Sequence, residues 1–208
     1  MNGMLCRVEA LRYSAWQSGA ETEPDISFTG ALFRRRLSLV SRMTIKVIHD
    51  LDPPDAPILF ASCRGEVSRQ FGINRMLIGE GELLPAVFSL SVFNAPPALA
   101  SMALNLRAGY TAICPADRRF SAVIETAAAA VIARGGAADS AGAVILAYAD
   151  EGLIPEYAPL SAESETPLAF AALLAVSGAG GVPLPFRESP RAFLEALQTE
   201  FAAAKTPS

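Results

Sequence analysis

Three cysteines and one histidine are the side chains of this 208-residue sequence best suited to covalent catalysis. Cys63 follows a short apolar run and precedes Arg64-Gly65, where a turn would expose its thiol. A thiol nucleophile needs a general base within about 3 Å, and His49 is the single histidine. A small acyl-transfer enzyme that uses Cys63 or Cys114 with His49 is therefore one hypothesis. The alternative is that both cysteines are small core residues and that His49 faces a loop at the end of a helix.

Other catalytic patterns are missing from the sequence. It contains no Gly-x-Ser-x-Gly motif, which argues against α/β-hydrolase chemistry. Its His, Cys and carboxylate residues are not clustered with the spacing of metal ligands, so we expect no metal. The glycine-rich stretches 79–81 and 178–181 match neither phosphate-binding motif, and we expect no cofactor.

The composition argues against disorder and against nucleic-acid binding. Apolar residues make up 51% of the chain, which is enough to form a core. Asp and Glu (21) outnumber Lys and Arg (17), and the net charge of −4 opposes contact with a phosphate backbone. Only 18% of the residues are charged, against about 25% in ordinary domains. We therefore expect another protein to cover part of the apolar surface.

The sequence predicts a cytoplasmic protein without a membrane span. The uncharged stretches 83–106 and 166–186 are interrupted by prolines, whereas a spanning helix needs about 20 uninterrupted apolar residues. Residues 1–12 carry charges where a signal peptide would have an apolar core. Three widely spaced cysteines (Cys6, Cys63 and Cys114) are typical of reduced thiols.

Strand and helix patterns alternate along the chain. A loose alternation of apolar and polar residues predicts a strand at 5–13, and short apolar runs predict strands at 58–62, 111–114, 143–149 and 168–176, with a further β-prone segment at 88–92. Periodicity, caps and helix formers predict helices at 32–51, 65–79, 98–106, 120–134 and 189–204. The alternation predicts an α/β fold with a mainly parallel mixed sheet, in a single domain 1–208. The helix at 120–134 contains four consecutive alanines, so we expect it in a buried inner layer, with Ser121 as its cap.

Basic residues are concentrated in one place. They are Arg34, Arg35, Arg36 and Arg42. They form either the solvated face of an amphipathic helix or a docking patch for an acidic partner, where charge would steer the encounter.

Several fragments, read in order, resemble one family. They are RYSAW (12–16), RRRLSLVSRM (34–43), LFASCRGE (59–66) and FSLSVFNA (88–95), together with Asp150 at the end of an apolar run. This order resembles the short, chain-length-factor-like β-ketoacyl synthase homologues of bacterial aryl polyene gene clusters. The resemblance implies a thiolase-like fold close to the N-terminal half of a β-ketoacyl synthase. It also implies a heterodimer with an active ketosynthase, and transient contact with acyl carrier protein.

The resemblance further implies that the chain is not catalytic. Active ketosynthases carry their cysteine between a strand and a buried helix, and counting from Gly109 places that position near Arg118. Cys114 lies about four residues too early, and arginine cannot accept an acyl group because it is permanently protonated. Active ketosynthases also take two histidines, or a histidine and an asparagine, from a second half. We therefore expect no condensing activity from this chain.

Site residues are implied in the same way. The strand that would pair across the dimer interface contains Tyr110, Thr111, Ile113 and Cys114. The residues that would approach the partner's acyl tunnel are Arg64, Gly65, Glu66, Val87, Phe88, Phe93 and Asn94. Phe88 or Phe93 would stop the growing chain, and Phe93 replaces the histidine that is usual in the family. The four arginines of the basic cluster would dock the carrier protein.

Half of a thiolase-type subunit would leave apolar helix surface uncovered. Each 100 Å² of such surface forgoes about 2.5 kcal/mol of burial. We expect either a partner to cover it or residues 168–204 to fold back as a lid. A purely structural homo-oligomer without a role in chain elongation is a third hypothesis.

Overall fold

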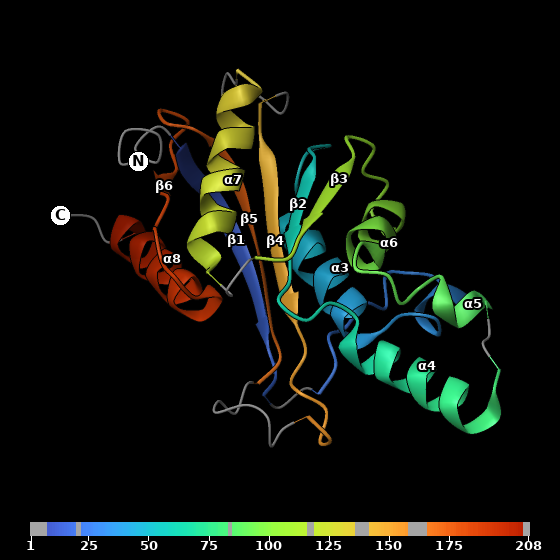
Figure 1. Cartoon of the computed structure of the whole chain (residues 1–208). Helices are drawn as coiled ribbons and strands as arrows, with labels where there is room; N and C mark the ends of the chain where they lie inside the picture. The colour runs from blue at the N-terminus through green and yellow to red at the C-terminus, as the bar shows by residue number, and fades with distance from the viewer. Residues whose placement is uncertain are drawn as a thin grey trace.

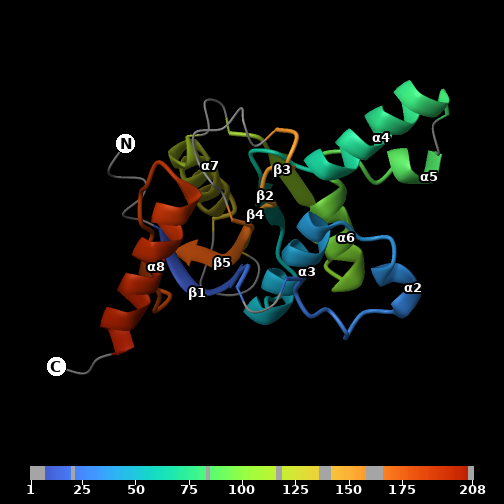
Figure 2. The same ribbon diagram turned by 90° about the horizontal axis from the view of Figure 1, so that it is seen from below.

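The computed structural model describes residues 8–19, 22–82, 85–115, 119–135, 142–157 and 166–205. Within these ranges the centre is a six-stranded sheet in the order β3-β2-β4-β5-β1-β6, with helices on both faces (Figures 1 and 2). The strands are β1 (Val8–Gln17), β2 (Ile58–Ala61), β3 (Tyr110–Ile113), β4 (Val144–Asp150), β5 (Leu168–Val176) and β6 (Val182–Pro183). The predicted α/β fold class is confirmed.

The strand directions differ from the prediction of a mainly parallel sheet. β2 runs parallel to β3 and β4, whereas the β4–β5, β5–β1 and β1–β6 pairs are antiparallel. β4 and β5 are buried along nearly their whole length. An unbroken apolar run shows that both faces of a strand are covered, but it does not fix the direction of the strand. The sheet is mixed, as predicted, but the prediction that it is mainly parallel is wrong.

Residues 168–205 complete the sheet rather than close over it as a lid. β5 lies between β4 and β1, and β1 in turn pairs with β6. The pairs Val8–Val176 and Gln17–Leu168 mark the two ends of the β1–β5 ladder. Helix α8 (Pro190–Lys205) then packs its buried apolar side into the core cluster that includes residues of β1, β4 and β5.

Two helices cover each face of the sheet. α7 (Phe120–Ala133) and α8 lie on one face, and α3 (Leu39–Leu51) and α6 (Ala95–Ala103) lie on the other (Figure 2). The rings of Phe120, Tyr148, Phe170 and Phe193 pack together under α7 and α8, with contacting centroids between 5.2 and 5.7 Å apart. Aromatic rings attract one another at this separation, so the cluster ties both helices to β4 and β5.

The alanine-rich helix α7 is buried on one side. Ala127 and Ala128 are fully buried against the sheet. Ala122, Ala129 and Ala133 are exposed on the opposite side. The prediction of a buried small-residue helix is therefore confirmed for its inner side, and the outer side faces solvent in this chain.

Two helices replace the single helix predicted at 32–51. α2 (Ala31–Arg34) is followed by a break, and α3 begins at Leu39. Ser38 has extended backbone angles, and its side-chain oxygen accepts a hydrogen bond from the Ser41 N–H at 3.0 Å. This is an N-cap, so the residue that starts α3 also interrupts the predicted helix.

Helices α4 (Val67–Glu80) and α5 (Pro85–Phe88) form an arm that projects from the body (Figures 1 and 2). Within α4 only Ile73 is buried. The β-prone interpretation of 88–92 is wrong, because Pro85 opens a helical turn and the Ser89 and Leu90 N–H groups bond to the Pro85 and Val87 carbonyls. In the described part of the chain, no helix has both the length and the apolar character needed to cross a membrane.

Candidate functional site

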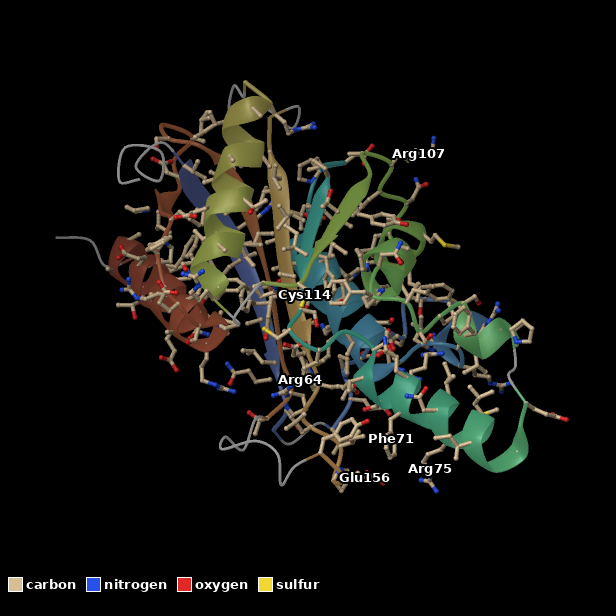
Figure 3. The ribbon with its side chains drawn as sticks, viewed as in Figure 1. Arg64, Phe71, Arg75, Arg107, Cys114 and Glu156 are labelled. Atoms are coloured by element: carbon tan, nitrogen blue, oxygen red, sulfur yellow. The ribbon has the colours of Figure 1, made fainter. Side chains whose placement is uncertain are left out.

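The carboxyl ends of three parallel strands meet at one edge of the sheet. In register, Ala61 at the end of β2 lies beside Ile113 of β3 and Tyr148 of β4. The next residues along these strands include Arg64, Cys114 and the end of β4 at Asp150. Figure 3 shows Arg64 and Cys114 at this edge, close to the start of α4. The fold therefore brings together segments that lie far apart in the sequence.

A buried carboxylate organises this edge. Asp150 is 5% exposed and accepts hydrogen bonds from the Ser62 and Tyr148 hydroxyls. It also accepts from the backbone N–H groups of Cys63, at 3.0 Å, and Arg64, at 3.1 Å. Burial, followed by the negative charge of Asp150, raises the pKa of Tyr148 far above its usual range, so the phenol stays protonated and continues to donate. We call these five residues the Asp150 cluster.

Gly65 connects the Asp150 cluster to Phe93. The Gly65 N–H donates to the Ser62 hydroxyl oxygen at 2.7 Å, and its φ of +58° is a conformation that favours glycine. A Cβ atom on Gly65 would lie 2.7 Å from the Phe93 ring. The Phe93 ring is half-buried and also packs near Phe60, at 6.2 Å between centroids. The glycine therefore lets the turn lie directly against the aromatic ring.

Glu66 is engaged inside the body. It is 1% exposed, and one carboxylate oxygen accepts from the Ser38 hydroxyl at 2.6 Å and the Ser41 hydroxyl at 2.9 Å. The other oxygen accepts from the Arg69 side chain at 3.3 Å. Glu66 was predicted to line an acyl pocket, but its carboxylate is committed to the amino end of α3.

Glu151 holds the base of the arm. Its carboxylate accepts from the Ser68 N–H at 3.0 Å, in the first turn of α4. Burial raises the pKa of Glu151, and the nearby Glu66 and Asp150 act in the same direction. Further along the same loop, Tyr157 packs edge-on against Phe71 of α4, at 5.4 Å between centroids. The segment after β4 therefore contacts the first half of α4 at two places.

Three further predicted pocket residues lie on or beside α5 and α6. Phe88 is 52% exposed, Val87 is half-buried, and Asn94 is an exposed residue at the start of α6. The Ser91 carbonyl, between them, accepts from the Gln70 side chain of α4 at 3.1 Å. The segment 87–94 is thus held by α4 and by the packing of Phe93 on Gly65.

The predicted pair of a cysteine with His49 does not form. The imidazole stacks on Phe28, at 3.7 Å between centroids, and its Nδ1 lies 3.2 Å from Asp50. Ser41, at the start of α3, touches Glu66 beside the Asp150 cluster, and His49 follows eight residues later on the same helix. Eight residues of helix span about 12 Å. The histidine therefore lies toward the end of α3 that points away from Cys63 and Cys114.

Strand β3 forms one edge of the sheet. Tyr110 is 41% exposed, Thr111 and Cys114 are exposed, and Ile113 is half-buried. Edge strands present unpaired backbone groups that another chain can extend. The predicted interface residues therefore share one accessible edge.

The segment between β3 and α7 includes the predicted nucleophile position. Arg118 lies outside the described residues. At the start of α7, the Phe120 N–H donates to the Glu188 carbonyl at 2.9 Å, and the Ser121 hydroxyl donates to the Glu188 carboxylate at 2.8 Å. The predicted role of Ser121 as a cap is wrong, since Arg119 is the N-cap residue and the Ser121 hydroxyl bonds to Glu188.

The basic cluster divides into internal and exposed members. Arg34 donates to the backbone carbonyls of Ser27 and Thr29. Arg42 pairs with Glu23 at 2.8 Å and also donates to the Arg34 carbonyl. Arg35 and Arg36 are exposed. Arg34 and Arg42 shape the loop before α3, so Arg35 and Arg36 are the members of the cluster whose side chains face solvent.

Sequence reasoning missed the role of Ser62 and Tyr148 in the Asp150 cluster. A usable signal was present, because Ser62 and Asp150 each end a short apolar run, and the ends of parallel strands meet at one edge. Within the described ranges, no three His, Cys, Asp or Glu side chains gather closely enough to hold a metal ion.

Comparisons with known proteins agree with this architecture. Residues 10–204 match the family described as β-ketoacyl synthase, N-terminal domain. The fold is similar to a chain in the structure of a ketosynthase (ApeO) in complex with its chain length factor (ApeC) from Xenorhabdus doucetiae. The TM-score is 0.69 and the identity 17%, over 97% of this chain and 92% of the other. No curated protein matches the sequence. The family match spans nearly the whole chain, and the chain therefore belongs to the β-ketoacyl synthase N-terminal domain family.

Proposed function

We propose that this chain is a non-catalytic, chain-length-factor-like subunit that pairs with an active β-ketoacyl-ACP synthase. One observation carries the proposal: no cysteine lies between Pro115 and Phe120, where β3 leads into α7. By the resemblance, this segment corresponds to the one in which active ketosynthases carry their cysteine. The similar solved structure is described as a ketosynthase in complex with its chain length factor, which supports the same arrangement for this chain.

The surface around β3 and the arm supports pairing with another protein. In the described residues, the large apolar side chains that are exposed lie on α2, α4, α5, α6 and β3 or on the loops beside α2 and α6. They are Phe28, Leu32, Leu77, Ile78, Phe88, Val92, Met102 and Tyr110. Exposed apolar surface of this kind is typical of protein interfaces. We infer that the partner ketosynthase covers β3 and part of the arm.

The finer assignments follow from the same pairing. Phe88 and Phe93 would bound the acyl chain in the partner's tunnel, and Arg35 and Arg36 would contact an acidic acyl carrier protein transiently. The product would be a polyene or a fatty-acid-type chain made in the bacterial cytoplasm. The predicted interface residues Tyr110, Thr111, Ile113 and Cys114 would lie at the centre of the contact.

Co-expression with the ketosynthase encoded beside this chain tests the proposal. We expect the two proteins to co-elute in size-exclusion chromatography at micromolar concentration. Tyr110→Glu places a charge on the exposed edge of β3 and should abolish co-elution. Gln198→Glu, an equal charge change at an exposed position of α8, should preserve it. Elution of the wild-type chains as two separate species contradicts the proposal.

Two further readouts separate the rival hypotheses. A thiol-reactive acyl analogue should leave Cys63 and Cys114 unlabelled in the native complex, and labelling of either would support a cysteine-dependent acyl-transfer enzyme. Phe88→Ala should lengthen the products of the complex. Unchanged products from an intact complex would favour a purely structural oligomer.

A further inference from the structure

The Asp150 carboxylate fixes the conformation of the turn at 62–65. It is buried, and three of its four donors come from consecutive residues of that turn: the Ser62 hydroxyl and the Cys63 and Arg64 N–H groups. A buried carboxylate that accepts several hydrogen bonds is costly to disturb, because each donor would lose its partner away from water. The turn therefore has little freedom to move while Asp150 is in place.

The turn in turn supports the Phe93 ring. Ser62 accepts the Gly65 N–H at 2.7 Å, which sets Gly65 at its positive φ. The ring of Phe93 then lies so close to Gly65 that a single added carbon would collide with it at 2.7 Å. Asp150 and Phe93 do not touch, but one continuous set of contacts joins them.

A second contact supports the rest of the segment 87–93. Gln70, in the first turns of α4, donates to the Ser91 carbonyl at 3.1 Å. α4 begins directly after the turn, and Glu151, the residue after Asp150, accepts the Ser68 N–H in its first turn. The end of β4 therefore sets both supports of residues 87–93.

We propose that Asp150 is a positioning residue that holds Phe93, and with it the segment 87–93, through the Ser62–Gly65 turn. The proposal rests on the proposed function in one respect, namely that this segment bounds the acyl chain of the partner. Asp150 itself is buried, with 5% of its surface exposed. Its effect on product length is indirect, because it decides where the Phe93 ring lies.

Hydrogen–deuterium exchange of the purified full-length chain tests the coupling. Asp150→Asn replaces one accepting oxygen by a donating NH₂ group, so at least one donor of the cluster loses its partner. Ser62→Ala is the milder variant, and it removes the hydroxyl that links Asp150 to Gly65. In both variants we expect amides 89–91 to exchange about tenfold faster than in the wild type, because local opening becomes easier.

Ser121→Ala is the matched control. It removes one hydroxyl-to-carboxylate hydrogen bond, to Glu188, which is not among the contacts that join Asp150 to Phe93 through the Ser62–Gly65 turn. We expect it to lower the melting temperature as Ser62→Ala does, but to leave exchange at 89–91 unchanged. The proposal would be overturned if, in Asp150→Asn and Ser62→Ala, the amides of 62–66 exchange faster than in the wild type while the amides of 89–91 exchange at the wild-type rate. If Asp150→Asn does not fold, Ser62→Ala against Ser121→Ala decides the question alone.

A second experiment uses the co-expressed complex. If it still co-elutes with the ketosynthase, the Ser62→Ala chain should shift the distribution of product lengths, and the Ser121→Ala chain should not. Unaltered products together with faster exchange at 89–91 would refute the role of Phe93 at the acyl chain, while the positioning by Asp150 would stand. The two proposals can therefore fail separately.

Discussion

The two halves of the molecule use their apolar residues differently. In the closed half, which contains β1, β4, β5, α7 and α8, the aromatic rings of Phe120, Phe170 and Phe193 are fully buried. In the open half, which contains α2, α4, α5, α6 and β3, large apolar side chains such as Ile78 (87% exposed) and Met102 (71% exposed) face solvent. The closed half is stabilised by its own side chains, whereas the open half leaves large apolar side chains exposed, a feature typical of protein interfaces.

The largest expected effect is the difference in stability loss between a phenylalanine of the closed half and one of the open half. Phe170→Ala removes a ring packed against Phe120, Tyr148 and Phe193, and it should lower the free energy of unfolding by about 3–5 kcal/mol. Phe88→Ala, at a ring that is 52% exposed, should change it by about 0.5 kcal/mol at most in the isolated chain. Denaturant unfolding measures both values. Equal losses would show that the open half is packed as tightly as the closed one.

Gly65 tests the junction between the halves. Gly65→Ala places a side chain at positive φ and against the Phe93 ring, and it should cost about 2–3 kcal/mol. In a Phe93→Ala background the collision disappears, so the same change should cost only about 1 kcal/mol. A double-mutant cycle in denaturant measures the difference. Additive losses would show that the ring moves aside freely.

Substitution of a second glycine should change the free energy of unfolding in the opposite direction. Gly72 lies within α4, and no atom lies within 4 Å of an added Cβ. Gly72→Ala should raise the free energy of unfolding by about 0.5–1 kcal/mol, because alanine is the better helix former and restricts the unfolded chain. A loss of stability would mean that the exposed arm is constrained at this point.

The smallest effect concerns pH. Glu151 has a raised pKa in the folded chain because it is buried, against about 4.3 when it is unfolded. Between these two values the folded state holds more proton, so the stability contributed by this group falls as the pH rises. Glu151→Gln removes this dependence, and its stability relative to the wild type should increase from about pH 4 toward pH 7. A flat or opposite difference between the two melting curves would show that the Ser68 N–H outweighs burial.

The sequence was informative where one pattern has one structural meaning. The apolar runs at 58–62, 143–149 and 168–176 are strands, and the alanine-rich run is a helix. It was less informative where chemistry depends on a distant partner. Ser38 interrupts a periodic helix because its hydroxyl caps the next one, and Pro85 turns a β-prone segment into a helical turn. Strand direction and the gathering of Ser62, Tyr148 and Asp150 depend on sheet topology, which local patterns do not specify.

The position of β1 has a consequence for how the protein is made. Its partner β5 lies about 150 residues further along the chain, and β1 sits between β5 and β6 in the sheet. A ribosome therefore releases β1 long before either neighbour exists, and this strand, which buries Val8, Ala10 and Trp16 in the folded chain, must wait unpaired while most of the chain is synthesised. Closing so long a loop also slows folding. Completion of the sheet around β1 must therefore follow translation of β5 and β6.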